Sequence, residues 1–125
     1  MEEIYTEDAP EPIGPYSQAI RDGDTVYVSG QGPADPESRE VEVSGIRDQT
    51  AQVLENAAAV LEAAGTSLEK VVQANVYLAD MADYDGMNEA YADSMDAPYP
   101  ARAAVEVAEL PVDARVEIEL VATLA

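Results

Sequence analysis

The chain is crowded with carboxylates, yet four of its segments carry none. Aspartate and glutamate number 26 among 125 residues, against six lysines and arginines. A chain this acidic covers its water-facing surface with carboxylate, so segments that lack acids are expected to be covered in the folded protein. These segments are residues 13–20, 25–34, 71–79 and 97–105. They are predicted to lie in a core or against another subunit; an ordinary core with chance gaps in the charge is the simpler alternative.

The spacing of apolar residues predicts two helices among short strands. Apolar residues three or four apart predict a helix over residues 46–64, ended by Gly65, and a second helix that begins near Asp83 and ends before Pro98. Alternating or apolar runs predict strands over residues 17–20, 25–30, 72–78, 103–108 and 115–123, and a short extended piece at 41–43. This order predicts an α+β fold in a single domain, 1–125: a mixed β-sheet with both helices packed on one face.

The composition argues against several classes of function. A net charge of −20 with a single lysine repels phosphate backbones, so nucleic acid is not expected as a partner. The chain has no cysteine and no histidine, so we expect neither thiol catalysis nor a transition-metal site. Self-repulsion of this size is screened in molar salt, where the Debye length is about 3 Å, which indicates a halophilic protein. The chain shows neither a signal-peptide pattern nor a membrane-spanning run, and we expect it in the cytoplasm.

Arg102 is the only charged residue in the last of the acid-free segments. Its guanidinium offers a planar fork of donors that suits a small carboxylate, and Pro100 restricts the backbone nearby. Arg102 is therefore a candidate substrate anchor, with a structural ion pair as the alternative. Arg115 is the contrasting case, because Glu117 and Glu119 share its strand face and are available to pair with it.

Glu117 is a candidate general base. It lies between apolar Val116 and Ile118, so its side chain points away from the face that those two residues share. Most of the acids in such a chain serve solvation, which is the simpler explanation for Glu117 as well.

Three other places have the chemistry of a ligand site. Ser29 and Gly30 end a strand with little side-chain bulk, so backbone N–H groups there could approach a ligand, although a plain strand end or bulge explains them equally. Tyr16 follows a rigid Gly-Pro turn and is either a core residue or a pocket wall. Asn88, on the second helix, is most simply a boundary residue.

Taken together, these residues closely resemble the reactive intermediate deaminase (Rid) family, in order and over almost the whole chain. The resemblance implies a chorismate-mutase-like fold, assembled as a homotrimer with three clefts between subunits. Similar proteins hydrolyse 2-imino or enamine acids, such as 2-iminobutanoate and 2-iminopropanoate, to 2-oxo acids and ammonia, with no cofactor and no metal. The motifs that carry it are Gly14-Pro15-Tyr16-Ser17-Gln18-Ala19, Val28-Ser29-Gly30-Gln31, Gln49-Thr50 with Asn56, Ala64-Gly65, Asp80-Met81, Asn88 with Tyr91, Pro100-Ala101-Arg102, Val107-Ala108 with Leu110-Pro111, and Val116-Glu117-Ile118-Glu119.

The resemblance also assigns roles to the candidate residues. Arg102 would grip the substrate carboxylate, and Glu117 would position or activate the water that adds to the imine carbon. The facing wall of the cleft would be shaped by Tyr16, Ser29 and Gly30, with Asn88 from the other subunit's side.

The chain departs from many relatives at Ala104, where they carry Cys, and at Ser94-Met95, where aromatic residues are common. These departures leave the substrate less defined than the reaction class. The competing function is a non-catalytic trimer that binds small carboxylates, or a chaperone-like protein, because the same clefts can bind without turnover. Ribonuclease activity, sometimes attributed to relatives, conflicts with the net charge and the missing histidine.

Overall fold

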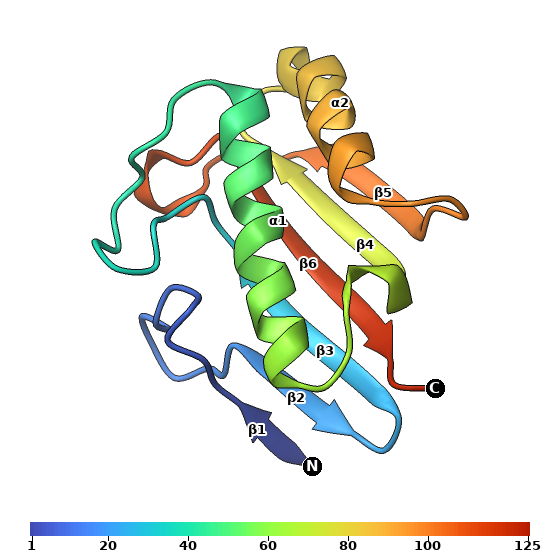
Figure 1. Ribbon diagram of the computed structural model, residues 1–125. Coiled ribbons are helices and arrows are strands. Elements are labelled where there is room, and N and C mark those ends of the chain that lie inside the picture. The colour runs from blue at the N-terminus through green and yellow to red at the C-terminus, as the bar shows by residue number, and fades with distance from the viewer.

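A six-stranded sheet carries both helices on one face (Figure 1). The computed structural model describes all 125 residues. Neighbouring strands are antiparallel except β4 and β5, which run parallel, so the sheet is mixed as predicted. In sheet order the strands are β1 (Glu2–Ile4), β2 (Ala19–Asp22), β3 (Thr25–Gln31), β6 (Val116–Thr123), β4 (Val71–Leu78) and β5 (Ala101–Glu106).

The long helix α1 (Ile46–Ala63) lies over β3 and β6, and α2 (Tyr84–Ser94) packs beside it toward the β5 edge (Figure 1). Gly65 ends α1, as predicted: it has a φ of 88°, and its N–H donates to the carbonyl of Glu62 at 3.0 Å. Glycine reaches this left-handed conformation without steric cost, which is why helices so often stop there. Neither helix is both long and apolar enough to cross a membrane.

The hydrophobic core lies between the helices and one face of the sheet. On β6, Val116, Ile118, Leu120 and Ala122 are buried toward the helices, while the residues between them are only half-buried. Such alternation is the geometry of a strand with two unlike faces. The opposite side of the sheet carries no helix, and we call it the open face. Its side chains come from β3, β4, β5 and β6 and include Tyr27, Gln73, Asn75, Tyr77, Val105, Glu117 and Glu119.

Several details differ from the sequence-based expectation, among them β2, which covers Ala19–Asp22 rather than residues 17–20. Strand β1 was not predicted, because in three residues only Ile4 is buried and no alternation is visible. Residues 41–43 are not a strand, and β5 begins at Ala101 rather than 103. Strand β5 is an edge strand with four of its six residues exposed, so burial leaves little pattern in its sequence.

Candidate functional site

The carboxylate of Glu117 packs against Gly30, on the neighbouring strand β3. A Cβ atom added at Gly30 would lie 2.5 Å from Glu117 Oε2 and 2.9 Å from Glu117 Cδ, closer than such atoms approach in proteins. The pairing of β3 with β6 shifts register between Val28 and Gln31, so the ladder is irregular at this place. The irregularity and the missing side chain together make room for the carboxylate on the open face.

Ser29 and Tyr16 form hydrogen bonds with the backbone beside this carboxylate. The Ser29 hydroxyl donates to the carbonyl of Ser17 at 2.6 Å, and the Ser29 N–H donates to the carbonyl of Gln18 at 2.9 Å. Tyr16 is half exposed, and its hydroxyl accepts from the N–H of Ile13 at 3.3 Å. The structure therefore places four of the predicted site residues around one cavity of about 640 Å³, lined among others by Tyr16, Ser29, Gly30, Glu117 and Glu119.

Two buried amide side chains hold the loops around this cavity, and neither was predicted to have a role. Gln18 accepts from the N–H of Thr6 at 2.7 Å and returns a hydrogen bond to its carbonyl at 3.0 Å. Asn56 on α1 donates to the carbonyls of Gly32 at 3.1 Å and Ala34 at 2.8 Å. Both amides are almost completely buried. Amides are common on surfaces, so only their place in the family-like motifs could have singled them out.

Burial raises the pKa of Glu117, and the charge of nearby Glu119 raises it further. Both effects disfavour the ionised form. A carboxylate in this position takes up a proton more readily than an ordinary glutamate, which suits a general base near neutral pH. No group of three or more acidic side chains has an arrangement that could hold a metal ion.

Arg102 lies elsewhere, on β5, with its side chain beneath α2. Its Nη2 donates to the Tyr84 hydroxyl at 3.2 Å, its Nη1 lies 3.8 Å from Met87 Sδ, and its guanidinium carbon stands 4.9 Å from the centre of the Tyr91 ring. Arg102 takes part in none of the three ion pairs of the chain, so an internal ion pair does not explain it. Half-buried Asn88 lies one helical turn from Tyr84, on the same stripe of α2.

The expected pairing of Arg115 with Glu117 or Glu119 is wrong. Arg115 instead binds Asp83, with its Nη1 3.2 Å from Oδ2. Arg115 directly precedes β6, and its guanidinium reaches the short turn before α2 that contains Asp83. Glu117 and Glu119 therefore have no cation partner within the chain.

Arg102 and Glu117 lie on opposite faces of the sheet. Arg102 is the cross-strand neighbour of Ala74, which is fully buried under the helices. Glu117 is the neighbour of Tyr77, on the open face. The two side chains therefore cannot meet within one chain. We call the two groups of residues the glutamate half-site (Tyr16, Ser29, Gly30 and Glu117) and the arginine half-site (Tyr84, Asn88, Tyr91 and Arg102); that the two groups form one site is a proposal.

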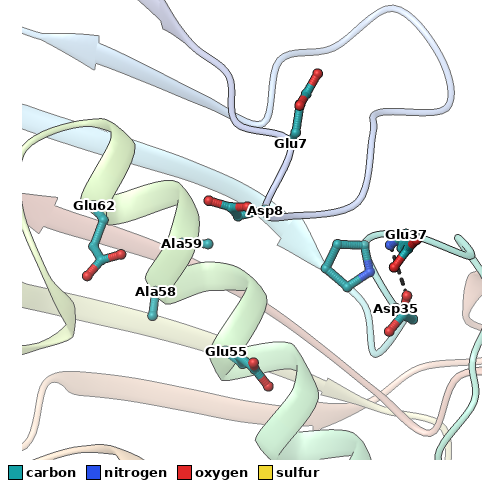
Figure 2. Close-up of a pocket in the computed structure, with 9 residues that line it drawn as sticks. Glu7, Asp8, Asp35, Glu37, Glu55, Ala58, Ala59 and Glu62 are labelled. Carbon is teal, nitrogen blue, oxygen red and sulfur yellow. Dashed lines mark hydrogen bonds between the residues drawn. The ribbon is translucent and has the colours of Figure 1, made fainter.

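A larger hollow of about 840 Å³ lies away from both half-sites, between α1 and two loops (Figure 2). Its carboxylates point in different directions rather than toward one centre (Figure 2). Asp35 accepts from the backbone N–H groups of Glu37 and Ser38, and these bonds lower its pKa. With no cation in its lining, this acidic groove repels anionic ligands. Its acids are Glu7, Asp8, Asp35, Glu37, Glu55 and Glu62.

The chain is similar to known proteins over nearly its full length. Residues 6–124 match the family model described as Endoribonuclease L-PSP. A RutC family protein of Pyrococcus horikoshii is 54% identical over 121 residues, covering 97% of this chain and 96% of that protein. A 2-iminobutanoate/2-iminopropanoate deaminase of Mus musculus is 44% identical, covering 95% and 88%. The crystal structure of RidA from the Antarctic bacterium Psychrobacter superposes with a TM-score of 0.95 at 47% identity, covering 98% and 99%.

Proposed function

This chain belongs to the Rid family, and from that membership we propose that it hydrolyses small 2-imino and enamine acids to 2-oxo acids and ammonia. 2-Iminobutanoate and 2-iminopropanoate are the substrates we propose, because the similar mouse protein is named for their deamination. The observation that carries the proposal is the pair of half-sites: a half-buried carboxylate facing a cavity, and a guanidinium with no acid partner.

The working unit we propose is a homotrimer. Its main support is that Arg102 and Glu117 need different copies of the chain to meet. The open face offers a surface for such a contact, since Tyr27 and Val105 are 51% and 47% exposed there and strands β3 and β4 carry no charged residue. When the arginine half-site of one copy meets the glutamate half-site of the next, the contact is head-to-tail, and such contacts form a ring when the rotation between copies closes. The three-membered ring is the one that the family resemblance implies.

Arg102 anchors the substrate in this proposal. Its planar guanidinium can donate two parallel hydrogen bonds to a carboxylate. Tyr84 and Tyr91 both contact the guanidinium, so little side-chain entropy is lost when the substrate binds. A neutral aromatic cradle also leaves the positive charge available, as an acid partner would not.

Glu117 moves the proton. As the water oxygen bonds to the imine carbon, one water proton passes to the Glu117 carboxylate and the π electrons of the C=N bond move to nitrogen. The proton then passes from Glu117 to that nitrogen, which gives a carbinolamine. As the C–N bond breaks, an electron pair of the hydroxyl oxygen forms the C=O bond and the hydroxyl proton passes through Glu117 to the departing nitrogen, which leaves as ammonia. The raised pKa lets Glu117 hold the proton between the two steps.

The surface charge bears on the rival functions and on the cellular setting. An endoribonuclease must approach a polyanion, and a net charge of −20 opposes that approach. A non-catalytic carboxylate-binding or chaperone-like trimer would bind its ligand through Arg102 in the same way and would not need Glu117 for proton transfer.

We propose that the protein works in a salt-rich cytoplasm, away from nucleic acid and membranes, because salt screens the mutual repulsion of its carboxylates.

The deciding assay follows the decay of 2-iminobutanoate, generated in place by a threonine dehydratase, in molar KCl. Wild-type protein is compared with Arg102→Ala and with Arg47→Ala, which removes a surface cation paired with Glu89. Acceleration by wild type and Arg47→Ala, but not by Arg102→Ala, supports the deaminase and its anchor. If folded wild-type protein binds small carboxylates without accelerating decay, the binding module is the correct function.

A further inference from the structure

Glu119 is a second carboxylate in the cavity, and the proposed hydrolysis leaves it without a role. It lies two residues after Glu117 on β6, on the same open face. Its Oε1 accepts from the Tyr77 hydroxyl at 2.6 Å and from Asn75 Nδ2 at 3.1 Å. Two donors on one carboxylate oxygen fix the position of the group.

The charge of Glu119 is held in place but not neutralised. Tyr77 and Asn75 are both uncharged donors, and the three ion pairs of the chain involve other acids. The hydrogen bond to Glu119, with burial second, raises the pKa of Tyr77, so the phenol stays protonated as a donor. The full negative charge therefore remains beside Glu117.

The two carboxylates have opposite environments. Asn75 is the cross-strand neighbour of Glu119, and Tyr77 is the neighbour of Glu117, yet the Tyr77 hydroxyl reaches diagonally to Glu119. Glu119 thus receives two hydrogen bonds from neutral donors, whereas Glu117 packs on Gly30 and is half-buried. Paired carboxylates in unlike surroundings can take different roles.

We propose that Glu119 is a positioning residue whose fixed charge sets the protonation state of Glu117, the proton carrier of the proposed function on which this inference rests. Burial and the charge of Glu119 raise the pKa of Glu117, in agreement with that arrangement. Arg39 is paired with Glu11 across the mouth of the cavity, and Arg115 with Asp83, so neither cation is free to offset the charge. The other titratable groups around Glu117 are Tyr16 in the cavity wall and Tyr77 on β4, and in the proposed trimer Arg102 of the neighbouring copy also faces this carboxylate.

The test is a ¹³C NMR titration of the Glu117 carboxyl, assigned with Glu117→Gln, at the lowest KCl concentration that keeps the protein folded. Glu119→Gln keeps an oxygen for Tyr77 and Asn75 but removes the charge. We expect Glu117 to titrate at lower pH in this variant than in wild type. Glu62→Gln, which removes one charge from the acidic groove on the helical side, is the matched control and is expected to leave the Glu117 titration in place.

Superposable Glu117 titrations in wild type and Glu119→Gln would overturn the inference. A second readout is the pH profile of kcat/KM for 2-iminobutanoate, whose acidic limb is expected to move to lower pH in Glu119→Gln. A purely structural Glu119 would instead lower the melting temperature and leave that limb in place. The titration needs no substrate. If the wild-type protein fails to hydrolyse imines, the proposed function is refuted, and the titration still decides whether the two carboxylates are coupled.

Discussion

Arg102 on β5 and Glu117 on β6 are separated by strand β4 and face opposite sides of the sheet. A site that needs both must draw them from two copies. Arg102→Ala and Glu117→Gln chains, each inactive alone, are therefore expected to recover activity when dissociated and reassembled together. Random 1:1 mixing in a ring gives each interface about one chance in four of combining the intact halves, so about a quarter of wild-type activity should return. Mixed trimers seen by native mass spectrometry but devoid of activity would contradict the shared site.

The guanidinium shape of Arg102 is expected to matter beyond its charge. Arg102→Ala should lower kcat/KM by about 30-fold or more, because truncating a partner of a charged, hydrogen-bonded contact costs about 2–5 kcal/mol. Arg102→Lys keeps the charge but loses the planar fork and the stacking on Tyr91. We expect it to retain an intermediate activity, with light scattering unchanged for both variants. Full activity of Arg102→Lys would show that charge alone is enough.

Gly30 should tolerate no side chain without loss of activity. In Gly30→Ala the new Cβ would clash with the carboxylate of Glu117, which must then move away from β3. We expect a large loss of kcat with little change in the far-ultraviolet circular dichroism. Gly32→Ala is the matched control, since a Cβ there has no atom within 4 Å. Equal activities of the two variants would mean that the position of the Glu117 carboxylate is unimportant.

The raised pKa of Glu117 predicts how stability depends on pH. The folded protein holds the Glu117 proton up to a higher pH than the unfolded chain does, so this group favours folding below its unfolded pKa. That contribution is lost as pH rises through the folded pKa. Glu117→Gln escapes the loss and is expected to melt at a higher temperature than wild type at pH 7, with the difference shrinking in acid. Melting curves at both pH values check this, and a lower melting temperature of the variant at pH 7 would contradict it.

The acidic groove predicts a dependence on salt. Its six carboxylates surround a hollow without a cation (Figure 2), and their repulsion is screened only when the Debye length becomes short. We expect the melting temperature to fall as KCl is lowered, and to fall less in the double variant Glu55→Gln, Glu62→Gln. Salt also strengthens the burial of apolar groups, so the comparison between the two proteins carries the test. Parallel salt curves would exclude the groove as a source of the requirement.

Patterns of burial were the part of the fold that could be predicted from the sequence. The end of α1 at Gly65 and the two faces of β6 followed from spacing alone, because in each case a single physical requirement dominates the choice of residue. Strand β1 and the start of β5 could not be found this way. They lie at the two edges of the sheet, where few side chains are buried and the backbone pairing leaves little trace in the sequence.

The candidate site, too, could be predicted from the sequence only in part. The chemistry of Arg102 and Glu117 was visible, since one is an isolated cation and the other interrupts an apolar strand. Their neighbours were not: the cradle of Tyr84 and Tyr91 around Arg102, and the preference of Arg115 for Asp83, depend on how α2 packs on the sheet. Contacts between elements far apart in the chain are set by packing, which local spacing does not encode.

The bare face of the sheet has a further consequence for an enzyme that completes its site between copies. A newly made chain would fold and yet be catalytically silent until it met its neighbours, so turnover per chain would rise with protein concentration and fall on dilution. In so acidic a protein the equilibrium between separate and assembled chains would also respond to ionic strength. Specific activity would then change both with protein concentration and with salt.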